Sequence, residues 1–202
     1  MNKFLTVSAT VFAAALALTG CSAGTGAAGS SMPSMNHGTS DMPATAAPLD
    51  TVTNNAADTM FVQGMIPHHS QAVEMSDIIL QKQDLDPQVT ALATKIKAAQ
   101  APEISTMTEW LKKWNEPEQM AAGHSMSGMV GEEDMSKLQA AQGADAAKLF
   151  LTQMIAHHQG AVMMAKTEEA DGQNADALAL SKEIIMSQQA EIQEMQTLLG
   201  SL

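Results

Sequence analysis

The chain has 202 residues, a formal net charge of −12 at pH 7, one cysteine, 17 methionines and no arginine. Its length allows one or two domains. Because an acidic chain without arginine cannot neutralise a run of phosphates, the composition excludes nucleic-acid binding and a polybasic membrane contact.

The N-terminus predicts export. Lys3 precedes an apolar run that ends Leu18-Thr19-Gly20-Cys21, which resembles a bacterial lipobox. Residues 1–20 are therefore expected to be a lipoprotein signal peptide, with lipidated Cys21 anchoring the protein to the outer face of the cell membrane. The alternative is an ordinary signal peptide with an incidental cysteine. An exported protein without thiols must bind soft metals through methionine and histidine.

Residues 21–50 predict a disordered tether, since they are rich in Ser, Ala, Gly, Thr and Pro. A tether needs no methionine to act as a spacer, yet this one contains candidates for weak capture of Cu(I), namely Met32, Met35, His37 and Met42.

From residue 51 to residue 202 the pattern predicts helices, the first over about 55–83. Residues 61–76 recur at 150–165, with identity at eight of the sixteen positions, including a His-His pair in each copy. Pro67 lies just before the first pair and predicts a kink or break that the second copy, with Ala156, does not need.

Each copy predicts one helix face that bears imidazole and thioether side chains. At about 100° per residue, the paired histidines and their flanking methionines fall within a single arc. One such helix would be read as an amphipathic core helix, but two copies favour a metal site. Imidazole with thioether indicates copper, above all Cu(I). The candidate ligands are Met65, His68, His69, Met75, Met154, His157, His158 and Met164. Imidazole must be neutral to bind, so affinity is expected to fall as the pH drops through about 6.5.

A second helix follows each copy. Asp86-Pro87 predicts the start of a helix that ends near Trp114, and Asn174 is expected to cap a helix that ends near Leu199. Both have polar residues in an otherwise apolar stripe, where they need partners. The expected partners are the histidines, with the carboxylates either ligating metal or orienting the imidazoles. These stripe residues are Gln100, Glu103, Met107, Gln188, Glu191 and Met195. The alternative is a stripe that faces a wet groove.

The joining segment, residues 115–144, is predicted to be flexible apart from a short helix near 133–141. It contains a second tract of weak metal-capture candidates, Met120, His124, Met126 and Met129. The third long helix is expected over about 145–169, ended by Asp171-Gly172.

Two helical hairpins, at about 55–114 and 145–200, predict an all-α four-helix bundle. The motifs M-I-P-H-H-x-x-A-V-x-M and M-I-A-H-H-x-G-A-V-x-M, with the paired I-x-x-x-Q-x-x-E-I-x-x-M, resemble the bacterial domain-of-unknown-function family 305 over about residues 55–200. This family includes CopM-like periplasmic copper-binding proteins. The resemblance implies a ferritin-like four-helix fold and extracytoplasmic copper binding linked to copper tolerance. Met163 corresponds to Glu74 in the first copy of the repeat and so has no methionine counterpart there, and no role is assigned to it.

Three classes of function remain open. The first is a copper-binding lipoprotein that sequesters copper or hands it to a partner protein, without enzyme activity. The second is a ferritin-like redox enzyme, although neither half has the Glu-x-x-His pattern of di-iron bundles. The third is a structural or partner-binding bundle held together by its histidine pairs.

Overall fold

The computed structural model describes residues 53–120 and 126–202, and within these ranges it has five α-helices and no β-strand. The all-α prediction is confirmed. The predictions for the signal peptide, the tether, Cys21, Met32, Met35, His37, Met42 and His124 lie outside the described residues. None of the described helices is long and apolar enough to cross a membrane. The helices are α1 (Ala56–Leu80), α2 (Pro87–Trp114), α3 (Glu132–Ala140), α4 (Gly143–Asp171) and α5 (Ala175–Ser201).

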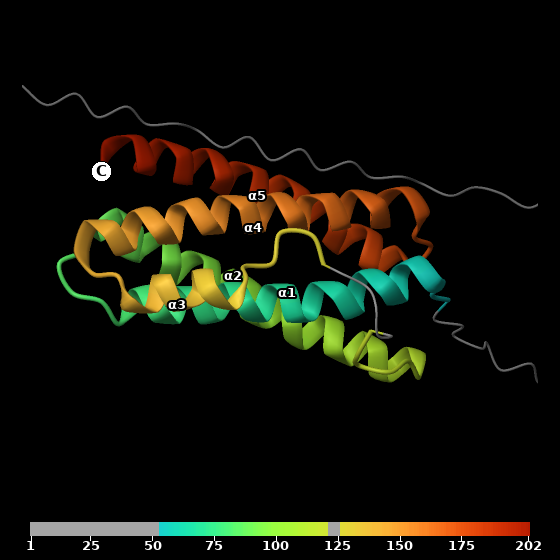
Figure 1. Cartoon of the computed structure of the whole chain (residues 1–202). Helices are drawn as coiled ribbons and strands as arrows, with labels where there is room; N and C mark the ends of the chain where they lie inside the picture. Colours follow the sequence, from blue (N-terminus) through green and yellow to red (C-terminus); the bar gives the residue numbers. More distant parts are fainter. Residues whose placement is uncertain (1–52, 121–125) are drawn as a thin grey trace, which may run out of the picture. The chain divides into compact units, whose positions relative to one another are not determined.

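The four long helices form two hairpins. α1 packs against α2 and α4 packs against α5, and the hairpins meet where α1 lies beside α4 (Figure 1). The short helix α3 contacts both α1 and α4. The two copies of the histidine motif therefore lie on the two central helices that face one another, as expected for a bundle built from a repeat.

Side-chain caps fix where the helices begin. Asn55 accepts hydrogen bonds from the first turn of α1 while the Asp58 carboxylate accepts one from the Asn55 amide, which forms a capping box. Asp86 and Asn174 cap α2 and α5 as the sequence predicts. Asp58 also accepts hydrogen bonds from the amides of Gln173 and Asn174, at 3.0 and 2.9 Å. It therefore ties the start of α1 to the α4–α5 turn.

α1 runs unbroken from Ala56 to Leu80 with Pro67 inside it, so of the two outcomes expected at Pro67, a kink or a break, the break is wrong. A proline in a helix removes one backbone donor and crowds one carbonyl, at a cost of about 3 kcal/mol. Extensive burial opposes that cost, since Phe61, Met65 and Met75 are all packed in the core. Tertiary packing thus keeps α1 continuous where local propensity favours a break.

The core consists of two apolar clusters. We call one the α3-side cluster, because it includes Leu138 of α3, and it contains Met75, Met154 and Met195. We call the other the pocket-side cluster, and it contains Phe61, Met65 and Met107, with Met164 packed against it. Along both α1 and α4, the paired histidines fall between residues of one cluster and residues of the other.

Candidate metal centre

Four histidines form a buried polar layer between the two apolar clusters. We call this the histidine layer; it consists of His68, His69, His157 and His158, none of which is more than 1% exposed. On α1, Met65 of the pocket-side cluster precedes the pair and Ala72 of the α3-side cluster follows it. The order is reversed on α4. The repeat thus places both pairs at one level of the bundle.

Two members of the layer are held by glutamates from the outer helices. His69 Nε2 donates to Glu103 Oε2 at 2.7 Å, and His158 Nε2 donates to Glu191 Oε2 at 2.8 Å. A carboxylate can only accept, so each bond places the ring proton on Nε2 and leaves Nδ1 with a free lone pair when the ring is neutral. This is how carboxylates orient metal-ligating imidazoles, and it confirms that the stripe glutamates partner the histidines.

The two glutamates differ in burial. The Glu191 side chain is 6% exposed and also lies 3.6 Å from Lys95 Nζ, whereas the Glu103 side chain is 24% exposed. Gln100 and Gln188 are buried near them on the same helices. The repeat is therefore symmetric in its polar partners but asymmetric in how far each partner is removed from water.

The other two histidines face one another at the centre. The ring centroids of His68 and His157 lie 3.7 Å apart, with the rings tilted by 38°. His68 Nε2 donates to the carbonyl of Ser127 at 3.2 Å. Neither ring nitrogen of His157 has a hydrogen-bond partner among the described residues, and the same holds for Nδ1 of the other three histidines. The layer thus contains five unpaired buried nitrogens, each of which costs roughly 1–3 kcal/mol of desolvation free energy.

Burial keeps the central imidazoles neutral. Desolvation, helped by the neighbouring histidines, lowers the pKa of His68 to about 3 and the pKa of His157 to about 2. Desolvation also lowers the pKa of His158, against the opposing effect of Glu191. Neutral imidazole is the form that binds metals. The fall of affinity near pH 6.5 stays a prediction, and the lowered pKa values of His68 and His157 favour a fall at lower pH.

The candidate thioether ligands are divided equally between the two sides of the layer. Met75 and Met154 lie in the α3-side cluster with Met195, and Met65 lies in the pocket-side cluster with Met107 and the partly buried Met164. Repeat-related methionines thus occupy opposite sides. Among the described residues, no three His, Cys, Asp or Glu side chains are arranged to hold a metal ion.

A strap over the layer is a feature that the sequence reasoning missed. We use this name for residues 126–130, which the sequence predicted to be flexible. Gln71 holds the strap by accepting from the Val130 amide and donating to the Val130 carbonyl, both at 2.8 Å. At the repeat-related position Gly160, an added Cβ would collide with the Ser127 carbonyl. The signal in the sequence was a glutamine in one copy and a glycine at the matching position of the other. Both positions contact the strap, because the glutamine holds it by hydrogen bonds and the glycine leaves room for it.

The methionines of the joining segment are placed in two settings. Met120 and Met126 line a pocket with Met60, Met163 and Met164, whereas Met129 is a half-buried residue of the strap. Met163, to which the sequence assigned no role, is 60% exposed at this pocket. The pocket brings together residues that the motif alone does not connect.

Fold and site together define a helical-bundle protein with a buried histidine layer flanked by methionines. The chain matches the domain-of-unknown-function family DUF305 over residues 58–199 and belongs to that family. The predicted family membership is therefore confirmed.

Several solved structures are similar to this chain. A DUF305 protein from Streptomyces coelicolor, described as a candidate secreted protein, is 34% identical with a TM-score of 0.68, covering 72% of this chain and 93% of its own. A DUF305 fragment from Deinococcus radiodurans is 30% identical, with a TM-score of 0.67 and coverages of 73% and 98%. CopM in its Cu(I)-bound form is 33% identical, with a TM-score of 0.60 and coverages of 71% and 96%. CopM is also known in Cu(II)-bound and silver-bound forms. No curated protein matches the chain.

Proposed function

We propose that this protein is an exported copper-binding protein that holds Cu(I) in the histidine layer and sequesters it or hands it on. The observation on which the proposal chiefly depends is the set of five unpaired imidazole nitrogens in a layer that is almost completely buried. Such groups are costly unless something pairs with them. A metal ion would pair with lone pairs that no protein donor reaches.

The neighbouring side chains favour copper over zinc. Structural zinc takes four ligands in a closed tetrahedron, drawn from His, Cys and carboxylates. Here the central pair, His68 and His157, has thioethers on both sides along the helices, and thioether is a soft donor that selects Cu(I). The similarity to CopM, which has been solved with Cu(I) and with silver, supports the same choice.

In this proposal the ligands are divided into ranks. The primary donors are His68 and His157, whose rings face one another, and one or two thioethers from among Met65, Met75, Met154 and Met164 complete the site. His69 and His158 are alternative donors through Nδ1, because no three His, Cys, Asp or Glu side chains among the described residues are arranged to hold one ion. Glu103 and Glu191 orient two of the rings, while Gln100, Gln188, Met107 and Met195 line the outer helices. Binding and transfer of the ion, without turnover, is the proposed activity. Sustained turnover of oxygen or peroxide by the copper-loaded protein would contradict it.

A competitive Cu(I) titration tests the site. The double variant His68→Leu/His157→Leu replaces the two central rings with apolar groups of similar size, so the bundle should remain helical by circular dichroism. It should lose the tightest Cu(I) binding. The matched control is His37→Leu, which lies outside the histidine layer and should keep the tightest Cu(I) binding. A helical double variant with unchanged Cu(I) affinity would overturn the proposal.

The lipid anchor is a separate part of the proposal, supported by the Leu18-Thr19-Gly20-Cys21 sequence after the apolar run. Cys21→Ala should release the protein from washed membranes or leave its signal peptide uncleaved. Unchanged membrane association of this variant would show that Cys21 is not the anchor. Titration with and without residues 22–50 would show whether Met32, Met35, His37 and Met42 add weaker copper binding.

A further inference from the structure

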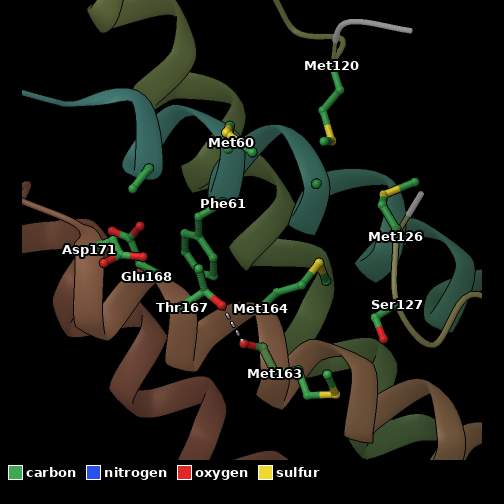
Figure 2. A pocket seen from close by; sticks show the side chains of 12 residues that line it. Met60, Phe61, Met120, Met126, Ser127, Met163, Met164, Thr167, Glu168 and Asp171 are labelled. Carbon is green, nitrogen blue, oxygen red and sulfur yellow. Dashed lines mark hydrogen bonds between the residues drawn. The ribbon is translucent and has the colours of Figure 1, made fainter. Parts of the chain in front are cut away.

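A pocket of about 470 Å³ opens beside the histidine layer and is lined by methionines from three parts of the chain. Met60 comes from α1, Met163 and Met164 come from α4, and Met120 and Met126 come from the two described ends of the joining segment (Figure 2). We call this cavity the methionine pocket. Five thioethers around one cavity are far more than ordinary methionine use would place there.

Packing does not explain these side chains. A buried methionine fills gaps in a core, but Met60 is 49% exposed and Met163 is 60% exposed. Among the described residues only three large hydrophobic side chains are exposed, and two of them are at this pocket. The third, Met186 on α5, lies elsewhere and serves as a natural control. Exposed methionines gathered at one opening gain little from the hydrophobic effect, so another role is indicated.

Two of the sulfurs converge over a glycine. A Cβ placed on Gly64 would stand 3.6 Å from Met120 Sδ and 3.6 Å from Met164 Sδ. The two sulfurs therefore lie no farther apart than twice that distance, although their residues are on different segments. Figure 2 shows Met120 and Met164 on opposite sides of the pocket, with Met126 at its edge. Since methionine side chains have several rotatable bonds, small rotamer changes would bring these sulfurs onto one ion.

We propose that Met60, Met120, Met126, Met163 and Met164 form a second metal site, solvent-accessible and built from thioethers, which takes Cu(I) or Ag(I). Thioether donors select soft monovalent ions. They also bind without losing a proton, so acid does not compete with the metal as it does at imidazole. The site goes beyond the proposed histidine centre and can exist without it.

The methionine pocket lies next to the histidine layer, which is the position expected of a site that captures an ion before the layer does. Ser127 lines the pocket, and its carbonyl accepts the hydrogen bond from His68 Nε2. One residue of the strap thus separates the methionine pocket from the histidine layer. An ion held at the exposed thioethers would be next to the closed layer, and movement of the strap would open the way between them.

Silver titration monitored by NMR of methionine methyl groups tests the proposal, because Ag(I) is diamagnetic and is a close analogue of Cu(I). In the wild type the five pocket methyl signals should shift, while the Met186 signal should not. Replacing Met60, Met120, Met126 and Met163 with leucine keeps the apolar volume and leaves in place Met164, which is also proposed for the histidine layer. This variant should bind fewer silver ions per chain, whereas Met186→Leu should bind as many as the wild type. Unshifted pocket signals together with unchanged stoichiometry in the fourfold variant would overturn the proposal.

Gly64→Ala provides a second and independent test. The added methyl would stand 3.6 Å from each of the two sulfurs, in ordinary van der Waals contact, and alanine is a better helix former than glycine. The variant should therefore be at least as stable as the wild type while binding silver at the pocket about tenfold more weakly. Unchanged pocket affinity in this variant would show that the sulfurs do not meet over Gly64. The same titrations in His68→Leu/His157→Leu separate the two sites, because pocket shifts should persist there even if the histidine proposal fails.

Discussion

The histidine layer and the methionine pocket present soft metal donors in two contrasting environments. The layer is almost completely buried, covered by the strap and fixed by two His–Glu hydrogen bonds. The pocket is open, and two of its five methionines are about half exposed. The comparison teaches that burial, more than the type of donor, should set how tightly and how slowly each region binds copper.

A physical reason underlies this difference. The buried imidazoles are held in place before binding, so a metal orders few new rotamers there, whereas the exposed methionines lose side-chain entropy when they close on an ion. The layer should thus bind tightly and exchange slowly. The pocket should bind more weakly and exchange faster, which suits a first point of capture.

The largest expected effect is on thermal stabilisation by copper. At a free Cu(I) concentration of about a thousand times the Kd, binding should stabilise the wild-type fold by about 4 kcal/mol. In His68→Leu/His157→Leu this gain should be lost, while the metal-free variant should unfold at or above the wild-type temperature, because unpaired buried nitrogens have been replaced by apolar groups. Differential scanning calorimetry with and without Cu(I) measures both. Strong destabilisation of the metal-free variant would instead identify the layer as a structural core.

The next effect concerns the strap. In Gly160→Ala the new Cβ would collide with the Ser127 carbonyl, so the strap must move away from α4. We expect a loss of roughly 1–3 kcal/mol in unfolding free energy and faster release of Cu(I) from the layer. Urea denaturation and stopped-flow transfer to a chelator provide the measurements. Gly200→Ala, where an added Cβ meets nothing within 4 Å, is the matched control.

A third effect compares the two His–Glu pairs. His158→Leu leaves Glu191 almost buried without its histidine, which should cost roughly 1–3 kcal/mol. His69→Leu should cost less, because Glu103 has a more exposed side chain and can turn to water. Chemical denaturation of the two variants measures the difference. Equal losses, or a larger loss for His69→Leu, would mean that burial of the carboxylates does not govern these pairs.

The last effect is the response of the metal-free protein to pH, which is small near neutral pH and grows in acid. Burial lowers the pKa of His68 from 6.5 to about 3 in the folded protein. Between these pH values the unfolded chain therefore binds a proton at this ring and the folded chain does not. The same holds for His157, whose pKa is lowered to about 2. These two rings therefore cost no extra stability above pH 6.5, and they destabilise the fold increasingly as the pH falls toward 3. His68→Leu/His157→Leu should show a shallower decline in urea midpoints between these pH values than the wild type does.

Much of the fold could be predicted from the sequence, because the relevant signals are local or repeated. Asp86-Pro87 and Asn174 are capping signals that depend only on their own turns, and the duplicated motif predicts two matching hairpins. That Glu103 and Glu191 would partner histidines followed from polar residues in apolar stripes, whereas the particular histidine that each one binds is known only from the structure. The break expected at Pro67 does not occur, because local helix propensity takes no account of the buried residues on both sides of the proline.

The remainder of the site depends on contacts between segments far apart in the chain. No spacing indicates that the Ser127 carbonyl lies on His68, or that Gly160 is small because the strap crosses there. Met120 and Met164 converge over Gly64 only because the joining segment returns to the face between α1 and α4. The depressed pKa values likewise follow from burial in the assembled bundle.

X-ray absorption of the protein loaded with a single equivalent of Cu(I) per chain tests the central claim most directly, since it distinguishes nitrogen from sulfur ligands. The proposal places the tight site in the histidine layer, so the first equivalent should show imidazole nitrogen, with the multiple-scattering pattern of the ring, and a smaller sulfur contribution. Further equivalents should add sulfur as the methionine pocket fills. A first equivalent bound only by sulfur would contradict the account, because the tightest site would then be among the methionines.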